Sequence, residues 1–133
     1  MSSNLFDMTN KVALITGSSK GIGRAIAEEM VRQGAKVVIS SRKADVCQEV
    51  ADAINAEAKA SGNQTGEAIV IPAHVGQREA LQHLVDETRA RLGQIDVLVC
   101  NAAVNPFYGS MQELPDDAMD KILDINIKSN HWL

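Results

Sequence analysis

The sequence predicts an α/β protein built on one parallel sheet, and two observations carry that prediction. Short runs of Val, Ile and Leu alternate four times with longer segments in which apolar residues recur every three or four positions. The connections between these segments are short, and such alternation is typical of parallel strands joined by right-handed crossovers. Aromatic residues make up only 3% of the chain, so its core depends on aliphatic side chains, as in sheets covered on both faces.

The first half of the chain contains two predicted strands, each followed by a predicted helix. The strands are the apolar runs 11–16 and 36–40, which are rich in β-branched residues. After the first strand, Ile22, Ile26 and Met30 recur at every fourth position, with charged residues between them. This spacing predicts an amphipathic helix with these three side chains on its buried face.

The same order of elements continues along the chain. The helix after the second strand covers residues 46–58 and leads to a third strand, 67–73. A helix over residues 80–92 then leads to a fourth strand, 95–100. After a loop, Pro115 and the two acidic residues behind it predict the first turn of a final helix. That helix is expected to continue to the end of the chain.

Composition and charge argue against several classes of protein. Thirteen basic and seventeen acidic residues, with no basic block, disfavour nucleic acid and anionic membranes as partners. No apolar stretch approaches the roughly 20 residues needed to span a bilayer, and the amino terminus lacks the pattern of a secretory signal. Cys47 and Cys100 have no metal-binding spacing and are expected to be small buried residues, so no metal site is predicted. We expect a soluble, cytosolic protein with a single domain over residues 1–133.

A glycine-rich turn, TGSSKGIG, lies between the first strand and the first helix. Gly17 permits a tight turn, Gly21 lets a ligand approach the backbone, and Gly23 lets the helix pack closely. The start of the helix adds unpaired N–H groups and the positive end of the helix dipole. The turn therefore predicts a binding site for the diphosphate of a nucleotide, against the simpler alternative of a plain strand-to-helix turn. The predicted contact residues are Gly17, Ser18, Ser19, Lys20, Gly21, Ile22 and Gly23.

The glycine spacing and two later motifs resemble one known family. The spacing is Gly-x-x-x-Gly-x-Gly, the fourth strand continues as IDVLVCNAA, and Asn126 lies in DINIKSN on the last predicted helix. Together these motifs resemble the short-chain dehydrogenases/reductases. The resemblance implies a Rossmann-type sheet, incomplete here with strand order 3-2-1-4, and hydride transfer between a nicotinamide cofactor and an alcohol or carbonyl substrate. It also implies a homo-oligomer when the protein is complete.

The residues after the second strand predict which cofactor is preferred. A carboxylate about 20 residues beyond the glycine loop would hydrogen-bond the adenosine ribose and favour NAD(H). The sequence has Ser41, Arg42 and Lys43 there instead, so no acidic group repels a 2′-phosphate. Arg42 offers a charge-assisted fork to that phosphate, and Lys20 supplies a second positive charge. NADP(H) is therefore predicted, against the alternative that these are solvated charges at a helix start.

The resemblance extends the cofactor site to two further loops. His74 and Val75 follow the third strand, beside the expected adenine, but His74 stands where the family has Asp. We expect a backbone contact from Val75 and, for His74, a loop histidine with its own hydrogen bonds rather than a cofactor ligand. Asn101 is expected to brace the sheet, and the backbone at Ala102 and Ala103 to line the nicotinamide ribose. The strings AHVG and NAAVNPFYG also resemble a branch containing NADPH-dependent carbonyl and retinol reductases.

Most of the family's catalytic residues have no counterpart in this sequence. The family uses a Ser, a Tyr with a Lys four residues later, and an Asn on the preceding helix. Asn126 matches the Asn, with the alternative that it faces solvent or satisfies a kinked backbone. Tyr108 is the only tyrosine; Gln112 follows it at the position of the Lys, and it precedes Asn126. The chain is therefore expected to carry the cofactor half of an enzyme and to be inactive alone.

Two other interpretations remain for the function. One is a non-catalytic nucleotide-binding or interaction module that works at this length. The other, a sugar epimerase, is disfavoured by the glycine spacing and by the place of Asn126. The predicted strand order leaves the fourth strand as an apolar edge, which promotes aggregation unless it is covered. We therefore expect that the polypeptide continues or that a partner supplies the remainder.

Overall fold

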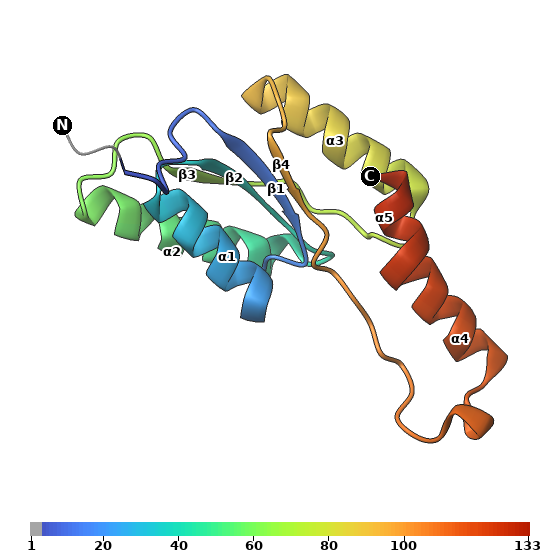
Figure 1. Cartoon of the computed structure of the whole chain (residues 1–133). Coiled ribbons are helices and arrows are strands. Elements are labelled where there is room, and N and C mark those ends of the chain that lie inside the picture. Colours follow the sequence, from blue (N-terminus) through green and yellow to red (C-terminus); the bar gives the residue numbers. More distant parts are fainter. Residues whose placement is uncertain (1–3) are drawn as a thin grey trace.

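Residues 4–133 are described by the structure, a computed structural model shown in Figure 1. Strands and helices alternate as predicted, up to a fourth strand that is followed by a long loop. The elements in chain order are β1 (Val12–Thr16), α1 (Gly21–Arg32), β2 (Lys36–Ser40), α2 (Ala44–Ala60), β3 (Glu67–Val70), α3 (Arg78–Leu92), β4 (Val97–Val99), the short 3₁₀ turn η1 (Met111–Glu113), α4 (Asp116–Leu123), η2 (Asp124–Lys128) and α5 (Ser129–Trp132).

The sheet has the order β3-β2-β1-β4, and every pair of neighbours is parallel. This confirms the predicted fold class and the predicted order 3-2-1-4. β1 lies between β2 and β4, with Thr16 opposite Ser40 and Ile15 opposite Val99. The carboxyl ends of these three strands therefore lie at one edge of the molecule, which is where parallel α/β sheets bind their ligands.

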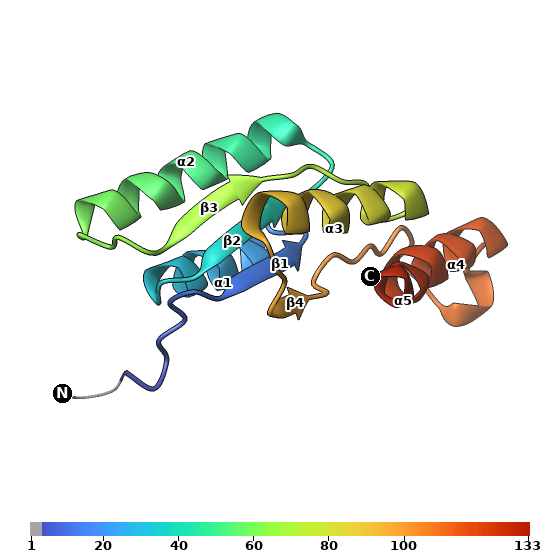
Figure 2. The ribbon, with the colours of Figure 1, turned by 90° about the horizontal axis from the view of Figure 1, so that it is seen from above.

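Two helices cover one face of the sheet and a third covers the other (Figure 2). Ala13 and Ile15 of β1 belong to a buried cluster with side chains of α1 and α2. Leu14, between them, belongs to the opposite cluster with Leu81 and Leu84 of α3. This alternation follows from the two-residue period of a strand. The two clusters form the core of a three-layer arrangement.

The buried face of α1 differs from the predicted one. Ile22 is 75% exposed, and Ile26 and Met30 are only half-buried. The fully buried row lies one position later and consists of small residues, because α1 packs close to the glycine loop and the sheet. That row is Gly23, Ala27 and Val31.

The third and fourth strands are shorter than the sequence predicted. β3 ends at Val70 rather than at Ala73. The N–H groups of Ile71 and Ala73 still donate to β2 and the residue after it, at 3.2 and 3.1 Å. β4 covers Val97–Val99 instead of 95–100, because the Asn101 N–H beyond its end turns back onto the Val99 carbonyl at 3.1 Å.

The two cysteines differ in exposure, which corrects one prediction. Cys47 on α2 is fully buried, as expected. Cys100, just beyond the edge strand β4, is exposed. Its surroundings still remove part of its contact with water, and this desolvation raises the pKa of the Cys100 thiol.

The final helix begins as predicted but changes its winding. Pro115 precedes the first turn of α4, which contains the two predicted acidic residues. From Asp124 to Lys128 the chain forms a π-helix, η2, before it returns to α-helix. The side chains of Ser129 and Asn130 donate to the carbonyls of Ile125 and Asn126, so these carbonyls have partners outside the regular helix ladder. Within residues 4–133, no helix has the length and apolar content to cross a bilayer.

Candidate cofactor site

The glycine loop lies at the carboxyl end of β1, where the chain paths on the two sides of that strand diverge. From β1 the chain crosses to β2 on one side, whereas β4 pairs with β1 on the other. Such a divergence leaves a crevice above the strand ends in parallel α/β sheets. The sequence prediction placed the nucleotide site at this position.

A different geometric feature explains why glycine occupies each of the three positions in this loop. Gly17 and Gly21 have φ angles of 64° and 57°, which favour glycine. A Cβ on Gly23 would lie 2.4 Å from the Gly17 carbonyl oxygen, so only glycine permits this packing. A Cβ on Gly21, in contrast, would meet no heavy atom within 4 Å. The loop is therefore closed toward the sheet at Gly23 and open to its surroundings at Gly21.

The amino terminus of α1 offers free hydrogen-bond donors. In residues 4–133, no acceptor pairs with the backbone N–H groups of residues 19–23. The residue before the helix, Lys20, provides no side-chain cap, and the first turn contains no acidic side chain. α2 and α3 each have one there, Asp45 and Glu79. The start of α1 therefore presents donors and a positive dipole end without a protein anion to neutralise them.

Ser18 supports this loop from below. Its side chain is fully buried and donates to the Ile15 carbonyl at 2.8 Å. It also accepts from the Ser40 N–H at 2.8 Å, and its own N–H donates back to the Ser40 carbonyl at 3.1 Å. The hydroxyl and the N–H are thus used within the protein. Ser18 therefore fixes the loop to β2, and its contact with a ligand stays a prediction.

Asn101 and Thr16 hold the two diverging loops together. The Asn101 side-chain amide donates to the carbonyls of Thr16 and Gly17 at 3.1 and 3.0 Å. The Thr16 hydroxyl accepts from the backbone N–H groups of Asn101 and Ala102, both at 3.1 Å. Asn101 thus braces the strand ends, while Ala103 is exposed beyond it. Sequence reasoning missed Thr16, although it is the one polar residue of the apolar strand β1 and directly precedes the glycines.

The basic residues predicted for the 2′-phosphate have free side chains. Lys20, Arg42 and Lys43 are exposed, and no hydrogen bond or ion pair engages their charged groups in the described part of the chain. Ser41 is half-buried, and its hydroxyl lies 3.1 Å from the Cys47 sulfur. The segment at the carboxyl end of β2 therefore carries positive charge and contains no carboxylate from Ser40 to Lys43.

In the loop after β3, His74 forms hydrogen bonds within the loop, whereas the Val75 N–H does not. The ring Nδ1 of His74 accepts from the Gly76 N–H at 3.0 Å, and its carbonyl accepts from the Gln77 N–H at 3.0 Å. This geometry agrees with a histidine that organises its own loop. The Val75 N–H has no acceptor among residues 4–133. It is therefore free for the predicted backbone contact.

Asn126 lies in the π-helix η2 and is bound to the loop after β4. Its side-chain oxygen accepts from the Val104 N–H at 2.8 Å, and its side-chain amide donates to the Val104 carbonyl at 3.0 Å. Both ends of the side chain are therefore used to hold one residue of that loop. In Figure 1 this loop extends away from the sheet before it returns as α4. Tyr108, in the same loop, is 99% exposed, so the structure gives it no partner in a catalytic arrangement.

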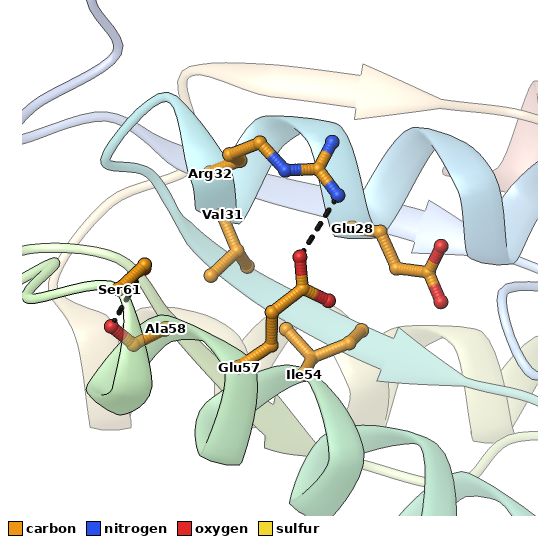
Figure 3. Close-up of a pocket in the computed structure, with 7 residues that line it drawn as sticks. All are labelled: Glu28, Val31, Arg32, Ile54, Glu57, Ala58 and Ser61. Carbon is orange, nitrogen blue, oxygen red and sulfur yellow. Dashed lines mark hydrogen bonds and ion pairs between the residues drawn. The ribbon is translucent and has the colours of Figure 1, made fainter.

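A separate hollow lies between α1 and α2, away from the glycine loop (Figure 3). It is partly open to solvent and is crossed by an ion pair in which Arg32 donates to Glu57 at 3.1 Å. The part of its lining that α1 supplies comes from the carboxyl-terminal half of that helix, whereas the free amides lie at the opposite end. The described residues contain no cluster of His, Cys, Asp and Glu that would hold a metal ion.

The strand order, the glycine loop and the free helix amides are those of a Rossmann-type fold. Residues 11–133 match the family model described as short chain dehydrogenase. The chain therefore belongs to the short-chain dehydrogenase family. A dehydrogenase/reductase SDR family member 4 from Bos taurus is 42% identical over 126 residues, which cover 95% of this chain and 43% of the relative. The chain thus spans less than half the length of this curated relative.

Solved structures of the family have the same fold. A short-chain type dehydrogenase/reductase from Mycobacterium marinum has a TM-score of 0.85 at 34% identity, over 96% of this chain and 49% of that one. A Pseudomonas aeruginosa RhlG/NADP active-site complex has a TM-score of 0.83 at 27% identity, over 96% and 46%. A 3-ketoacyl-(acyl-carrier-protein) reductase from Brucella melitensis complexed with NADH has a TM-score of 0.82 at 25% identity, over 95% and 48%. Of these three structures, one is a complex with NADP and another is a complex with NADH.

Proposed function

We propose that this chain binds NADP(H) and provides the cofactor half of an oxidoreductase that acts on an alcohol or a carbonyl substrate. The observation that carries the proposal is the uncapped start of α1, where the N–H groups of residues 19–23 have no acceptor among the described residues. These donors suit the diphosphate of a dinucleotide. Bound NADP(H) supplies the hydride chemistry, and the chain's residues position it.

The preference for the 2′-phosphorylated cofactor rests on the end of β2. Arg42 and Lys43 are exposed without an acidic partner in the described chain, and Ser41 supplies a hydroxyl between them and the sheet. A guanidinium pairs well with a phosphate through two parallel hydrogen bonds. The nearest acidic residue in sequence, Asp45, lies in the first turn of α2, so it follows the basic pair rather than replacing it.

Asn126 is the one family catalytic position that this chain contains. Both polar ends of its side chain bind Val104, so we propose that it acts by holding the loop after β4 in place. The substrate class, the likeness to carbonyl and retinol reductases, the cytosolic location and the homo-oligomeric assembly stay predictions.

The proposal is tested by comparing the affinities of NADPH and NADH for the wild-type chain and for Ser41→Asp/Arg42→Ala. The wild type is expected to bind NADPH at least about tenfold more tightly, since hydrogen bonds to charged groups contribute about 1.5–3 kcal/mol. The double variant is expected to lose that advantage. Lys59→Ala removes an exposed positive charge in the last turn of α2 and serves as the matched control.

Equal binding of NADH and NADPH by the wild type would contradict the NADP assignment, and binding of neither would contradict the site itself. The competing function, a non-catalytic nucleotide-binding module, makes a different prediction for turnover. Steady-state reduction of a carbonyl compound by the 133-residue chain would speak against that module. Nucleotide binding without turnover agrees with both a module and a cofactor half.

A further inference from the structure

Cys47 contacts the hydroxyl on which the proposed 2′-phosphate site depends. Its sulfur lies 3.1 Å from the Ser41 oxygen, a distance at which either group is able to donate. Cys47 is fully buried in the first turns of α2, beneath the half-buried Ser41 at the end of β2. The pair therefore joins the apolar core to the basic loop above it.

The direction of this hydrogen bond decides what Ser41 offers to a ligand. A hydroxyl has one hydrogen to donate and two lone pairs to accept with. The Lys43 N–H already donates to Ser41 Oγ, at 3.4 Å. If the Cys47 S–H also donates to it, both lone pairs are used and the hydroxyl hydrogen points elsewhere. If Ser41 instead donates to the sulfur, its hydrogen is turned into the core.

A phosphate group favours the first of these arrangements. Its oxygens accept hydrogen bonds, so a neighbouring hydroxyl helps only when it presents its hydrogen. A hydroxyl that presents a lone pair to a phosphate repels it. Cys47 also donates its backbone N–H to the Lys43 carbonyl at 3.1 Å, so this one residue is bonded on both sides of Arg42.

We propose that Cys47 is a positioning residue for cofactor selectivity, whose buried thiol donates to Ser41 and so directs the Ser41 hydroxyl hydrogen toward the 2′-phosphate. This inference rests on the proposed NADP(H) function. It assigns no ligand contact to Cys47 itself. The effect is confined to the phosphorylated ribose, because the diphosphate contacts arise at the start of α1.

The experiment compares two adenosine fragments that differ only in the 2′-phosphate. Binding of adenosine 2′,5′-bisphosphate and of adenosine 5′-monophosphate is measured by calorimetry on the wild-type chain, Cys47→Ala and Cys47→Ser. Cys47→Ala is expected to lower the ratio of the two affinities about threefold, less than the roughly tenfold effect of a lost hydrogen bond to a charged group, because the Ser41 hydroxyl keeps its hydrogen but loses the donor that orients it. Cys47→Ser keeps a donor at the same place and is expected to restore most of the ratio.

A purely structural role of Cys47 predicts something else. Val50→Ala is the control, because Val50 is another buried residue of α2 and its apolar side chain has no hydrogen-bond donor for Ser41. This variant is expected to lower the melting temperature without changing the ratio of the two fragment affinities. Ser41→Ala is expected to lower the ratio more than Cys47→Ala does, and the double variant Ser41→Ala/Cys47→Ala to lower it no further than Ser41→Ala alone. Where Cys47→Ala folds poorly, Cys47→Val takes its place in the cycle, because it fills the buried position without a donor.

The outcomes separate this inference from the function on which it rests. A wild-type chain that binds both fragments equally overturns the NADP preference and the role of Cys47 with it. A clear wild-type preference that Cys47→Ala leaves unchanged, or that Cys47→Ser fails to restore, overturns the positioning role alone. Equal weakening of both fragments by Cys47→Ala also overturns it, because a general loss of structure acts on both.

Discussion

The two edges of the sheet are finished in different ways. At β3, the Asn55 side chain of α2 donates to the Ala68 carbonyl and accepts from the Ala68 N–H, both at 2.8 Å. Arg91 of α3 donates to the Val70 carbonyl at 3.0 Å. At β4, no side chain of the described residues pairs with Val97 or Leu98, and the Leu98 side chain is 41% exposed.

This difference teaches how a parallel sheet is closed. An unpaired edge strand presents N–H and C=O groups that pair with other chains unless something covers them. Asn55 acts as a substitute strand, because its amide offers the same donor and acceptor as a peptide unit. β4 has no such substitute among the described side chains.

The largest expected effect concerns the closed edge. Asn55→Ala leaves the Ala68 N–H and carbonyl without their partner, at a cost of about 1–3 kcal/mol in the free energy of unfolding. Urea unfolding followed by circular dichroism measures this loss. Gln48→Ala on the same helix removes an exposed side chain that hydrogen-bonds only Asp52, and its cost is expected to be within about 0.5 kcal/mol.

Asn55→Asp refines this comparison. It keeps an acceptor for the Ala68 N–H but replaces the donor with a carboxylate oxygen that repels the Ala68 carbonyl, so its stability at neutral pH should fall clearly below that of the wild type. If Asn55→Ala is as stable as Gln48→Ala, the edge of β3 does not depend on this side chain. The contrast between the two edges would then have no energetic basis.

The smallest expected effect is chemical and reports on the open edge. Cys100 is exposed, so iodoacetamide should label it in the folded chain, whereas the buried Cys47 should be labelled only on unfolding. Desolvation raises the pKa of the Cys100 thiol, so less thiolate is present at neutral pH than in an unhindered cysteine. Its labelling should therefore be slower than that of a model thiol at pH 7 and should accelerate as the pH rises through the raised pKa.

Mass spectrometry of the labelled chain measures both rates. Protection of Cys100 that persists on dilution would mean that β4 is covered within the chain itself, contrary to the exposure of this thiol. Protection that disappears on dilution would mean that two copies associate through this edge. Labelling of Cys47 in the folded chain at the same rate would contradict its burial.

The sequence predicted the order of strands and helices because period and glycine placement are local signals. Sequence reasoning failed where packing between distant segments determines which helix face is buried or how a helix is wound. The buried face of α1 is set by the close approach of Gly23 to Gly17 and Asn101, which no periodicity in α1 reveals. The π-helix at Asn126 arises after a regular helical pattern, and only the side chains that follow it indicate a change.

The candidate site was predicted to the level of loops but not of individual roles. The glycines, Asn101 and the basic residues after β2 lie where the motifs placed them. Whether a polar side chain faces a ligand or the protein depends on burial, and burial is a property of the whole fold. Ser18 and Ser19 are neighbours of the same type, yet only Ser18 is buried and used beneath the loop.

The central claim, a diphosphate site at the start of α1, is tested most directly by a nuclear magnetic resonance titration of the ¹⁵N-labelled chain with NADPH. The backbone amides of residues 19–23 are predicted to shift most, followed by those of residues 41–43, while the amides of β4 residues Val97 and Leu98 stay nearly unchanged. A saturable change that is largest at the start of α1 would support the assigned diphosphate site. Resonances of residues 19–23 that do not move at saturating NADPH would contradict it.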